Sequence, residues 1–263
     1  MNKSSNFDNS LSAGRALTLT LPGNCLLQMI WCPPGEFVMG STPDDELAGN
    51  TEKPPQAVKV SRGFWIAQCP ITQTQWEAVM KTRMPLFDED AESGLLPAEG
   101  MTWHDAQNFC DTLTSLLKTQ ELLSGEQRVG LPGEAQWEYA CRAGTTTRWY
   151  FGDNESDLSQ HAWYRDNSGR TTHPVGLKAA NPWGLYDLYG NVAEWCMDDF
   201  SLYSPAPKHA EEPVLVNDPI TLKIVRGGAF SHLARECRSA SRESILFDNP
   251  YNEPTGLRPI MFE

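Results

Sequence analysis

The sequence predicts an α+β fold with few helices, short strands and long irregular connections. Apolar segments of strand length occupy the first part of the chain, three helical patterns follow, and no helical period persists in the second half. The 20 Gly and 19 Pro predict many turns, and the nine Trp predict that large buried rings hold those turns together. A chain of 263 residues is long enough for one large domain with a sizeable core.

Three strand candidates lie near the start of the chain, at residues 36–39, 57–60 and 64–67. Gly, Pro and acidic residues separate them, so we expect one small antiparallel sheet. Residues 1–24 begin as a polar stretch without a pattern, which predicts a flexible N-terminal arm. The domain itself is predicted to cover residues 25–263.

Three helices have recognisable starts. Thr72 and Gln75 have the spacing of a capping box, in which each side chain bonds the other residue's backbone N–H. A second helix is predicted after Thr102 and a third after Gly133, with Gly144 placed to end the third. The second helix carries one apolar stripe that should pack on the sheet, made of Trp103, Ala106, Phe109, Cys110, Leu113, Leu116 and Leu117.

The charge balance argues against two classes of partner. The formal net charge is −13 and the sequence pI is about 4.8, so nucleic acid and anionic membrane surfaces would be repelled. No apolar run has the length of a membrane span, and residues 1–21 lack the layout of a signal peptide. Seven Cys without C-x-x-C spacing favour reduced thiols, so we expect a cytoplasmic protein.

Five segments resemble, in order, the signature segments of the formylglycine-generating-enzyme (sulfatase-modifying factor) family. They are PPGEFVMGS at 33–41, PITQTQW at 70–76, EAQWEYACRAG at 134–144, NPWGLYDLYGNVAEW at 181–195, and RGGAF at 226–230 followed by CRSASR at 237–242. The resemblance runs over roughly residues 29–258. It implies a single irregular C-type-lectin-like domain of the α+β class, with little regular secondary structure.

The resemblance also indicates where oxidase chemistry would lie. In family members that convert a sulfatase cysteine to formylglycine, two cysteines that follow R-G-G-S-W bind copper as thiolates. Counted from Phe230, which replaces the Trp, the matching positions here are His232 and Cys237. Because Cu(I) prefers two sulfur ligands, we expect neither copper nor this oxidase activity. The pair could instead act as nucleophile and base, or Cys237 could be a small buried apolar residue.

A calcium site is predicted at the turn that contains Asn191, Val192 and Glu194. The resemblance implies structural calcium here, held by the side-chain oxygens of Asn191 and Glu194 and by the backbone carbonyl of Val192. In the alternative, both side chains only bond backbone N–H groups of the turn. Another branch of the family uses iron, but the five His of this chain lack metal-binding spacing, so we do not expect iron.

The closing segments should be structural. We expect the double glycine at 227–228 to mark a close approach of two backbones, because it lacks the lysine and helix of a phosphate-binding loop. We expect Arg226, Arg238 and Arg242 to form structural ion pairs. Their candidate partners are Asp187, Asp198 and Asp199.

The resemblance leaves several functions open. The first is a non-catalytic binding or regulatory module that contacts a protein or small molecule through loops at 167–173 and 231–236, with residues 244–254 beside them. Asn167, His173 and Arg235 represent these loops. The second is a metal-dependent oxidoreductase of the same family that acts on a different substrate. A third is a receptor of the retroelement-diversified kind.

Three departures from the family pattern bear on the shape of the binding groove. Ala193 replaces a usual Trp, residues 229–230 read Ala-Phe in place of Ser-Trp, and Gly130 and Gly133 stand where Arg and Thr are usual. Each departure removes bulk or a polar anchor, so we expect the fold to be kept and the groove to differ.

Overall fold

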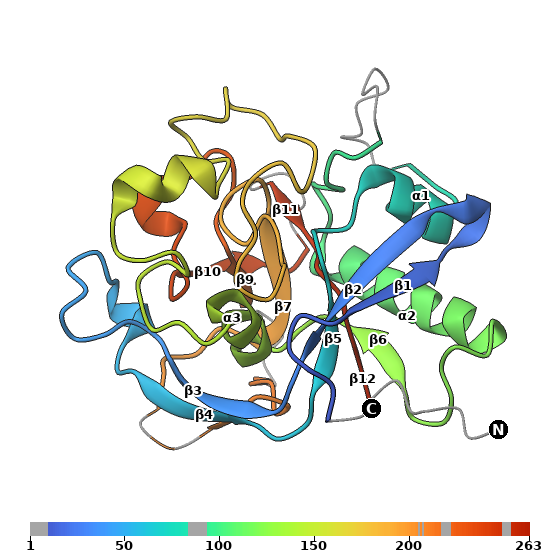
Figure 1. Cartoon of the computed structure of the whole chain (residues 1–263), viewed down its shortest axis with the longest axis horizontal. Coiled ribbons are helices and arrows are strands. Elements are labelled where there is room, and N and C mark those ends of the chain that lie inside the picture. Colours follow the sequence, from blue (N-terminus) through green and yellow to red (C-terminus); the bar gives the residue numbers. More distant parts are fainter. Residues whose placement is uncertain (1–9, 84–93, 205, 207, 217–221, 249–253) are drawn as a thin grey trace.

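The computed structural model describes residues 10–83, 94–204, 206, 208–216, 222–248 and 254–263. Within this part of the chain, three β-sheets and three α-helices enclose two clusters of buried apolar side chains (Figure 1). Long irregular segments join these elements, most clearly between residues 143 and 192, as the composition predicts. The α+β prediction is therefore confirmed.

The largest sheet has the strand order β1-β2-β5-β12-β6, and all of its neighbouring strands run antiparallel. The C-terminal strand β12 inserts between β5 and β6, so the two ends of the chain belong to one sheet. The strands are β1 (Ala16–Thr20), β2 (Leu26–Cys32), β5 (Phe64–Ala67), β6 (Arg128–Gly130) and β12 (Ile260–Phe262).

The start of the domain corrects the prediction of an arm over residues 1–24. Residues 16–20 form β1, which pairs with β2 from Ala16 opposite Ile30 to Thr20 opposite Leu26. Leu19 is buried on the side of the strand that faces the core. Leu and Thr alternate in this segment, which is a strand pattern that the prediction of an arm did not take into account. The part of the prediction that concerns residues 1–9 lies outside the described residues.

Two smaller sheets complete the fold. One has the order β10-β9-β7-β11 and the other the order β3-β4-β8. Their strands are β3 (Gly35–Met39), β4 (Gln56–Val60), β7 (Ala193–Asp199), β8 (Lys208–His209), β9 (Leu222–Arg226), β10 (Arg242–Leu246) and β11 (Thr255–Gly256).

The single small sheet predicted from residues 36–39, 57–60 and 64–67 is wrong in its third strand. Strands β3 and β4 pair as expected, but β5 lies in the five-stranded sheet between β2 and β12. All four residues of β5 are buried. A strand covered on both faces is more stable in the centre of a large sheet than at the edge of a small one.

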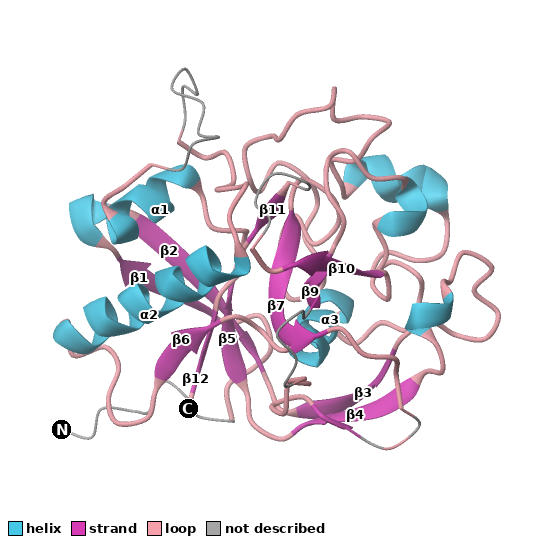
Figure 2. Ribbon diagram, turned by 180° about the vertical axis from the view of Figure 1, so that it is seen from behind, coloured by secondary structure: helices cyan, strands magenta, loops and turns pink. Residues whose placement is uncertain are grey.

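The three predicted helices are present as α1 (Gln73–Met80), α2 (Trp103–Thr119) and α3 (Glu134–Arg142). The predicted capping box is confirmed, since Thr72 and Gln75 bond each other's backbone N–H groups at 3.2 and 3.0 Å. Helix α2 packs its apolar stripe beside β6 on the five-stranded sheet (Figure 2). Helix α3 is buried on all sides, which places its polar side chains inside the molecule. No described helix is long and apolar enough to cross a membrane.

Candidate functional site

A network of buried arginines and carboxylates lies around helix α3. The apolar residues of this helix belong to the second cluster of buried side chains, which also contains Trp149, Tyr189 and Cys237. The fully buried Arg226 bonds Glu138, which also accepts from Arg142 at 2.8 Å and from the N–H of Gly40 at 2.9 Å. Burial alone would raise the pKa of Glu138, but Arg142 and Arg226 hold that pKa below its usual value. The carboxylate is therefore ionised and fully bonded, and its role is structural.

The predicted acidic partners of the arginines are corrected. Arg242 bonds Glu134 at 2.7 Å, and Arg238 bonds Glu52 at 2.7 Å and Asp45 at 3.1 Å. The aspartates Asp198 and Asp199 pair instead with Lys208 and Lys223. Proximity in the sequence suggested the aspartates, whereas the fold brings Glu134 of helix α3 to Arg242, and Glu52 and Asp45 to Arg238, from distant parts of the chain. The expectation that these pairs are structural agrees with their burial.

The turn predicted to bind calcium has its side-chain oxygens engaged. Asn191 accepts from the N–H of His173 through Oδ1 and donates to the carbonyl of His173 through Nδ2, both at 3.0 Å. Glu194 accepts from Arg258 at 2.7 Å and from the indole N–H of Trp137 at 2.6 Å. A calcium ion would have to displace these donors, so the residues present do not fit the ion. For Asn191, the contacts favour the alternative in which the side chain bonds the backbone.

We expect calcium removal to leave the stability of the protein unchanged. The oxygens of Asn191 and Glu194 already accept from protein donors, so no charge is left uncompensated when the ion is absent. The measurement is the melting temperature in EDTA and after calcium is restored. A fall of several degrees in EDTA that calcium reverses would show that the prediction from sequence was right.

The second predicted pair, His232 and Cys237, does not form an open catalytic site. The thiol of Cys237 is buried within the second cluster, and burial raises its pKa far above the usual range of a cysteine. A Cβ on Gly228 would lie 2.8 Å from this sulfur, so the double glycine permits a close approach, as predicted. The ring of His232 lies 3.8 Å from the carboxylate of Glu243. A thiol that stays protonated and covered does not fit a copper ligand.

The two predicted contact loops lie against one another. The N–H of Arg165 donates to the carbonyl of His232 at 3.0 Å, and the hydroxyl of Ser168 donates to the carbonyl of Phe230 at 2.8 Å. In Figure 1, the yellow helical segment at 155–160 and the red turn at 234–236 lie on the same side of the molecule. The structure therefore forms one surface from segments 163–173 and 230–236. Of the adjoining segment 244–254, residues 249–253 lie outside the described residues.

The three named loop residues have different roles. Asn167 closes its own turn, since it accepts from the N–H of Tyr164 and donates to the carbonyl of Ala162, both at 2.9 Å. His173 stacks on Trp163 with ring centres 3.8 Å apart. Only Arg235 extends into solvent, with its side chain 61% exposed. Asn167 and His173 thus hold the loop in shape, and Arg235 is available for contact.

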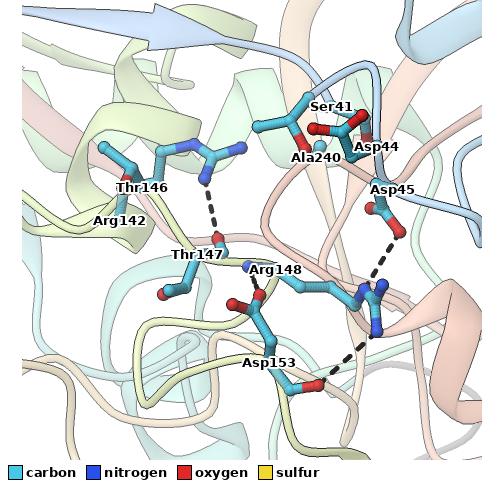
Figure 3. Close-up of a pocket in the computed structure, with 10 residues that line it drawn as sticks. Ser41, Asp44, Asp45, Arg142, Thr146, Thr147, Arg148, Asp153 and Ala240 are labelled. Carbon is cyan, nitrogen blue, oxygen red and sulfur yellow. Dashed lines mark hydrogen bonds and ion pairs between the residues drawn. The ribbon is translucent and has the colours of Figure 1, made fainter.

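A polar cavity of about 270 Å³ lies between the segment at 41–45 and the loop at 146–153 (Figure 3). Arg148 crosses it. Its guanidinium donates to Asp45 at 2.9 Å, and its backbone N–H donates to the carboxylate of Asp153 at 2.7 Å. Arg142 donates to the carbonyl of Thr147 at 3.0 Å. Both guanidinium groups that line the cavity therefore already have partners within the protein, so neither is a free donor for a ligand.

Asp187 is a buried carboxylate that the sequence suggested only as a candidate ion-pair partner of the arginines. This carboxylate is buried beside Arg258 and Glu194, and it accepts from the N–H of Gly176 at 2.7 Å. Burial raises its pKa from 3.8 to about 6, an effect that Glu194 increases and Arg258 opposes. No pattern in the sequence marks a single Asp of this kind, because the shift depends on groups that only the fold brings together.

Comparison with known proteins agrees with this architecture. Treponema denticola variable protein 1 superposes with a TM-score of 0.78 at 26% identity, over 93% of this chain and 98% of that protein. The chaperone protein LppX of Paenibacillus barcinonensis is 28% identical in an alignment 211 positions long, which covers 64% of this chain and 69% of the relative.

Other relatives match over smaller parts of their length. The formylglycine-generating enzyme of Mycobacterium tuberculosis is 35% identical in an alignment 125 positions long, which covers 39% of this chain and 40% of the enzyme. The chain spans 21% of the serine/threonine-protein kinase pkn1 of Chlamydia caviae. The family model of the sulfatase-modifying factor enzyme 1-like domain matches residues 19–258, almost the whole chain. The chain therefore belongs to the sulfatase-modifying factor enzyme 1-like (formylglycine-generating-enzyme) family.

Proposed function

We propose that this chain is a non-catalytic binding module of its family, and that it contacts a partner through the surface formed by segments 163–173 and 230–236. The burial of the Cys237 thiol carries the proposal. A nucleophile or a metal ligand must be a thiolate that its substrate or metal can reach. The sulfur of Cys237 is covered, and burial raises its pKa, so it meets neither condition. A metal-dependent oxidoreductase that uses His232 and Cys237 would need both in one open cleft.

The contact surface is held rigid beneath exposed side chains. Ser168 and His173 tie its first loop, through a bond to the carbonyl of Phe230 and a stack on Trp163. A surface that is already ordered loses little conformational entropy when it binds, which favours affinity. The family fold thus serves as a support for the loops.

Arginines supply the charge of this surface. The side chains of Arg165 and Arg235 are 50% and 61% exposed, and Arg170 is also exposed. Asp166 and Glu236 lie 3.7 and 3.6 Å from the first two guanidinium groups, but such exposed pairs contribute little and are easily exchanged. On a chain of net charge −13, these arginines favour a partner that presents carboxylates to the loops.

The relatives support a binding role to different degrees. The Paenibacillus relative is named as a chaperone and matches 211 residues. The Treponema neighbour is named as a variable protein and matches nearly the whole fold. The formylglycine-generating enzyme matches a shorter part of this chain.

A capture experiment with charge-reversed variants tests the proposal. The immobilised full chain is exposed to extract from the organism of origin, and we expect one retained protein with wild type. The double variant Arg165→Glu/Arg235→Glu should retain at least tenfold less of it, because both substitutions lie on the contact surface. The matched control is Arg15→Glu/Arg83→Glu, which makes the same charge change at exposed sites elsewhere.

Equal retention by wild type and by the Arg165→Glu/Arg235→Glu variant would place the contact elsewhere on the molecule. No retained protein, combined with protein-dependent oxidation of a cysteine peptide, would remove the proposal altogether.

A further inference from the structure

A larger cavity, of about 400 Å³, lies where the three sheets meet, and none of its lining residues belongs to the contact loops. Its walls come from the β4–β5 turn, from β6 and the start of α3, from β7, from the segment after β8, and from the end of β12. In Figure 1, the C-terminus and the β3–β4 pair mark this end of the molecule. The apolar part of the lining comprises Phe64, Leu131, Met197, Pro213 and Phe262. Its size suits a small molecule or one apolar chain.

The polar group at the inner end of the cavity is the side chain of Gln136. This side chain is 6% exposed and lines the cavity. Its Oε1 accepts from the N–H of Gly133 at 2.9 Å, and since an N–H can donate only to the oxygen, this bond fixes which way the amide points. Nε2 makes no hydrogen bond within the described part of the chain. Two amide hydrogens are thus held in place at the cavity wall without a protein acceptor.

The charged residues of the lining are Arg62, Arg128, Glu211, Glu212 and Glu263, and two of them make contacts within the protein. Glu211 accepts from the N–H groups of Ser61 and Arg62 at 2.6 and 2.9 Å, and the guanidinium of Arg128 lies 4.9 Å from the ring centre of Phe262. The rim carries both signs of charge and so does not select strongly for either. Gln136 adds a fixed, uncharged donor to this lining.

We propose that this cavity binds a small amphipathic molecule, whose apolar chain lies between the rings and methyl groups of the wall and whose carbonyl or carboxylate oxygen accepts from Nε2 of Gln136. Nε2 faces the cavity without an acceptor from the described residues, and a ligand oxygen placed against it would gain a hydrogen bond whose direction the bond to Gly133 already sets. A molecule whose polar group can only donate would place a donor against the donor Nε2, and so would form no hydrogen bond there. The site is independent of the contact loops, so the failure of either proposal leaves the other standing.

Three probes of equal chain length test the selectivity of the site. Hexanoate carries a charged acceptor, N,N-dimethylhexanamide a neutral acceptor, and hexylammonium only donors. Amide chemical-shift changes in the wild-type protein report where each probe binds. We expect both acceptor probes to bind with dissociation constants near 1 mM and to shift the amides of Gly133 and Phe64. Hexylammonium should bind at least tenfold more weakly. The two acceptor probes together distinguish a carboxylate ligand from a neutral carbonyl.

The decisive variant is Gln136→Glu. The new carboxylate can still accept from the N–H of Gly133, and Glu is favoured at this third position of a helix, so the fold should be kept. The donor is replaced by an acceptor, so binding of both acceptor probes should fall at least tenfold while hexylammonium gains. Gln127→Glu is the matched control, because Oε1 of Gln127 accepts from the N–H of Ser124 at 3.0 Å and the residue does not line the cavity.

Two results would overturn the proposal. One is that no acceptor probe shifts the amides around the cavity of the wild-type protein at about 10 mM, a concentration that would nearly saturate a millimolar site. The other is that Gln136→Glu binds all three probes as wild type does. The first result needs no variant, so the proposal can be tested even if Gln136→Glu proves unstable.

Discussion

Replacing Glu194 with Gln is expected to lower the free energy of unfolding by about 3–5 kcal/mol. Arg258 is fully buried, and Glu194 is the acidic group that it bonds, at 2.7 Å. The remaining acceptors of Arg258 are backbone carbonyls, including that of Tyr186 at 2.7 Å, which cannot neutralise a buried cation. The variant also places an amide N–H among the donors of Arg258 and Trp137. Chemical denaturation followed by tryptophan fluorescence measures the effect.

An exposed ion pair provides the control. Arg83 lies 2.7 Å from Glu77, with side chains 61% and 38% exposed, so Glu77→Gln should cost less than about 1 kcal/mol. A loss of equal size in both variants would mean that burial of the Arg258 pair does not determine its contribution. The double variant Glu194→Leu/Arg258→Met should recover part of the stability, since it leaves no uncompensated charge from this pair but removes the partners of the Trp137 indole and of the Tyr186 carbonyl.

Replacing Asp187 with Asn is expected to stabilise the protein at pH 8 and to have little effect near pH 4. The folded-state pKa of Asp187 is raised from 3.8 to about 6, chiefly by burial. A raised pKa means that the carboxyl favours folding when protonated, and that this contribution is lost as the pH rises through 6. At pH 8, the charged form costs on the order of 2–3 kcal/mol, which the neutral Asn avoids.

Asn also suits the backbone at this position. Asp187 has a φ of +52°, a conformation in which Asn is among the best-tolerated residues, and the Asn oxygen can still accept from Gly176. Thermal melts of wild type and variant from pH 4 to pH 8 give the measurement, with the exposed Asp166→Asn as control. A constant difference across this range would show that the carboxyl of Asp187 does not titrate within it.

The local parts of the fold could be predicted from the sequence because their signals lie close together. The capping box of Thr72 and Gln75 and the apolar stripe after Thr102 each lie within a few turns of helix, and both helices begin where they indicate. The family segments likewise predicted the fold class.

The pairing of strands and charges could not be predicted, because it depends on contacts between distant residues. Strand β12 lies between β5 and β6, although about 130 residues or more separate it from each of them. Glu134 and Glu138 look like surface residues of a polar helix, yet α3 is buried and they neutralise arginines from the C-terminal part of the chain. One signal was present, since an i, i+4 pair of carboxylates on a short helix rich in aromatics can form a single acidic face.

In the candidate sites too, the sequence predicts positions, whereas contacts between distant residues determine their chemistry. Counting from Phe230 gives His232 and Cys237 as the candidate pair, and only the fold reveals that the thiol is covered. The turn at 191–194 offers the oxygens of a calcium site in sequence, and in three dimensions His173 and Arg258 take them. The free amide of Gln136 follows from its bond to Gly133 and from the walls around it. Motifs thus identify positions, and burial decides what those positions can do.

The most direct test of the proposed non-catalytic role is a mass-spectrometric assay for aldehyde on a cysteine-containing peptide, incubated with the full chain, Cu(I) and dioxygen. The buried thiol of Cys237 predicts no aldehyde above that formed without protein, and no difference between wild type and Cys237→Ala. Aldehyde formed in proportion to the amount of protein, and lost in Cys237→Ala, would contradict the proposal and identify the chain as an oxidase.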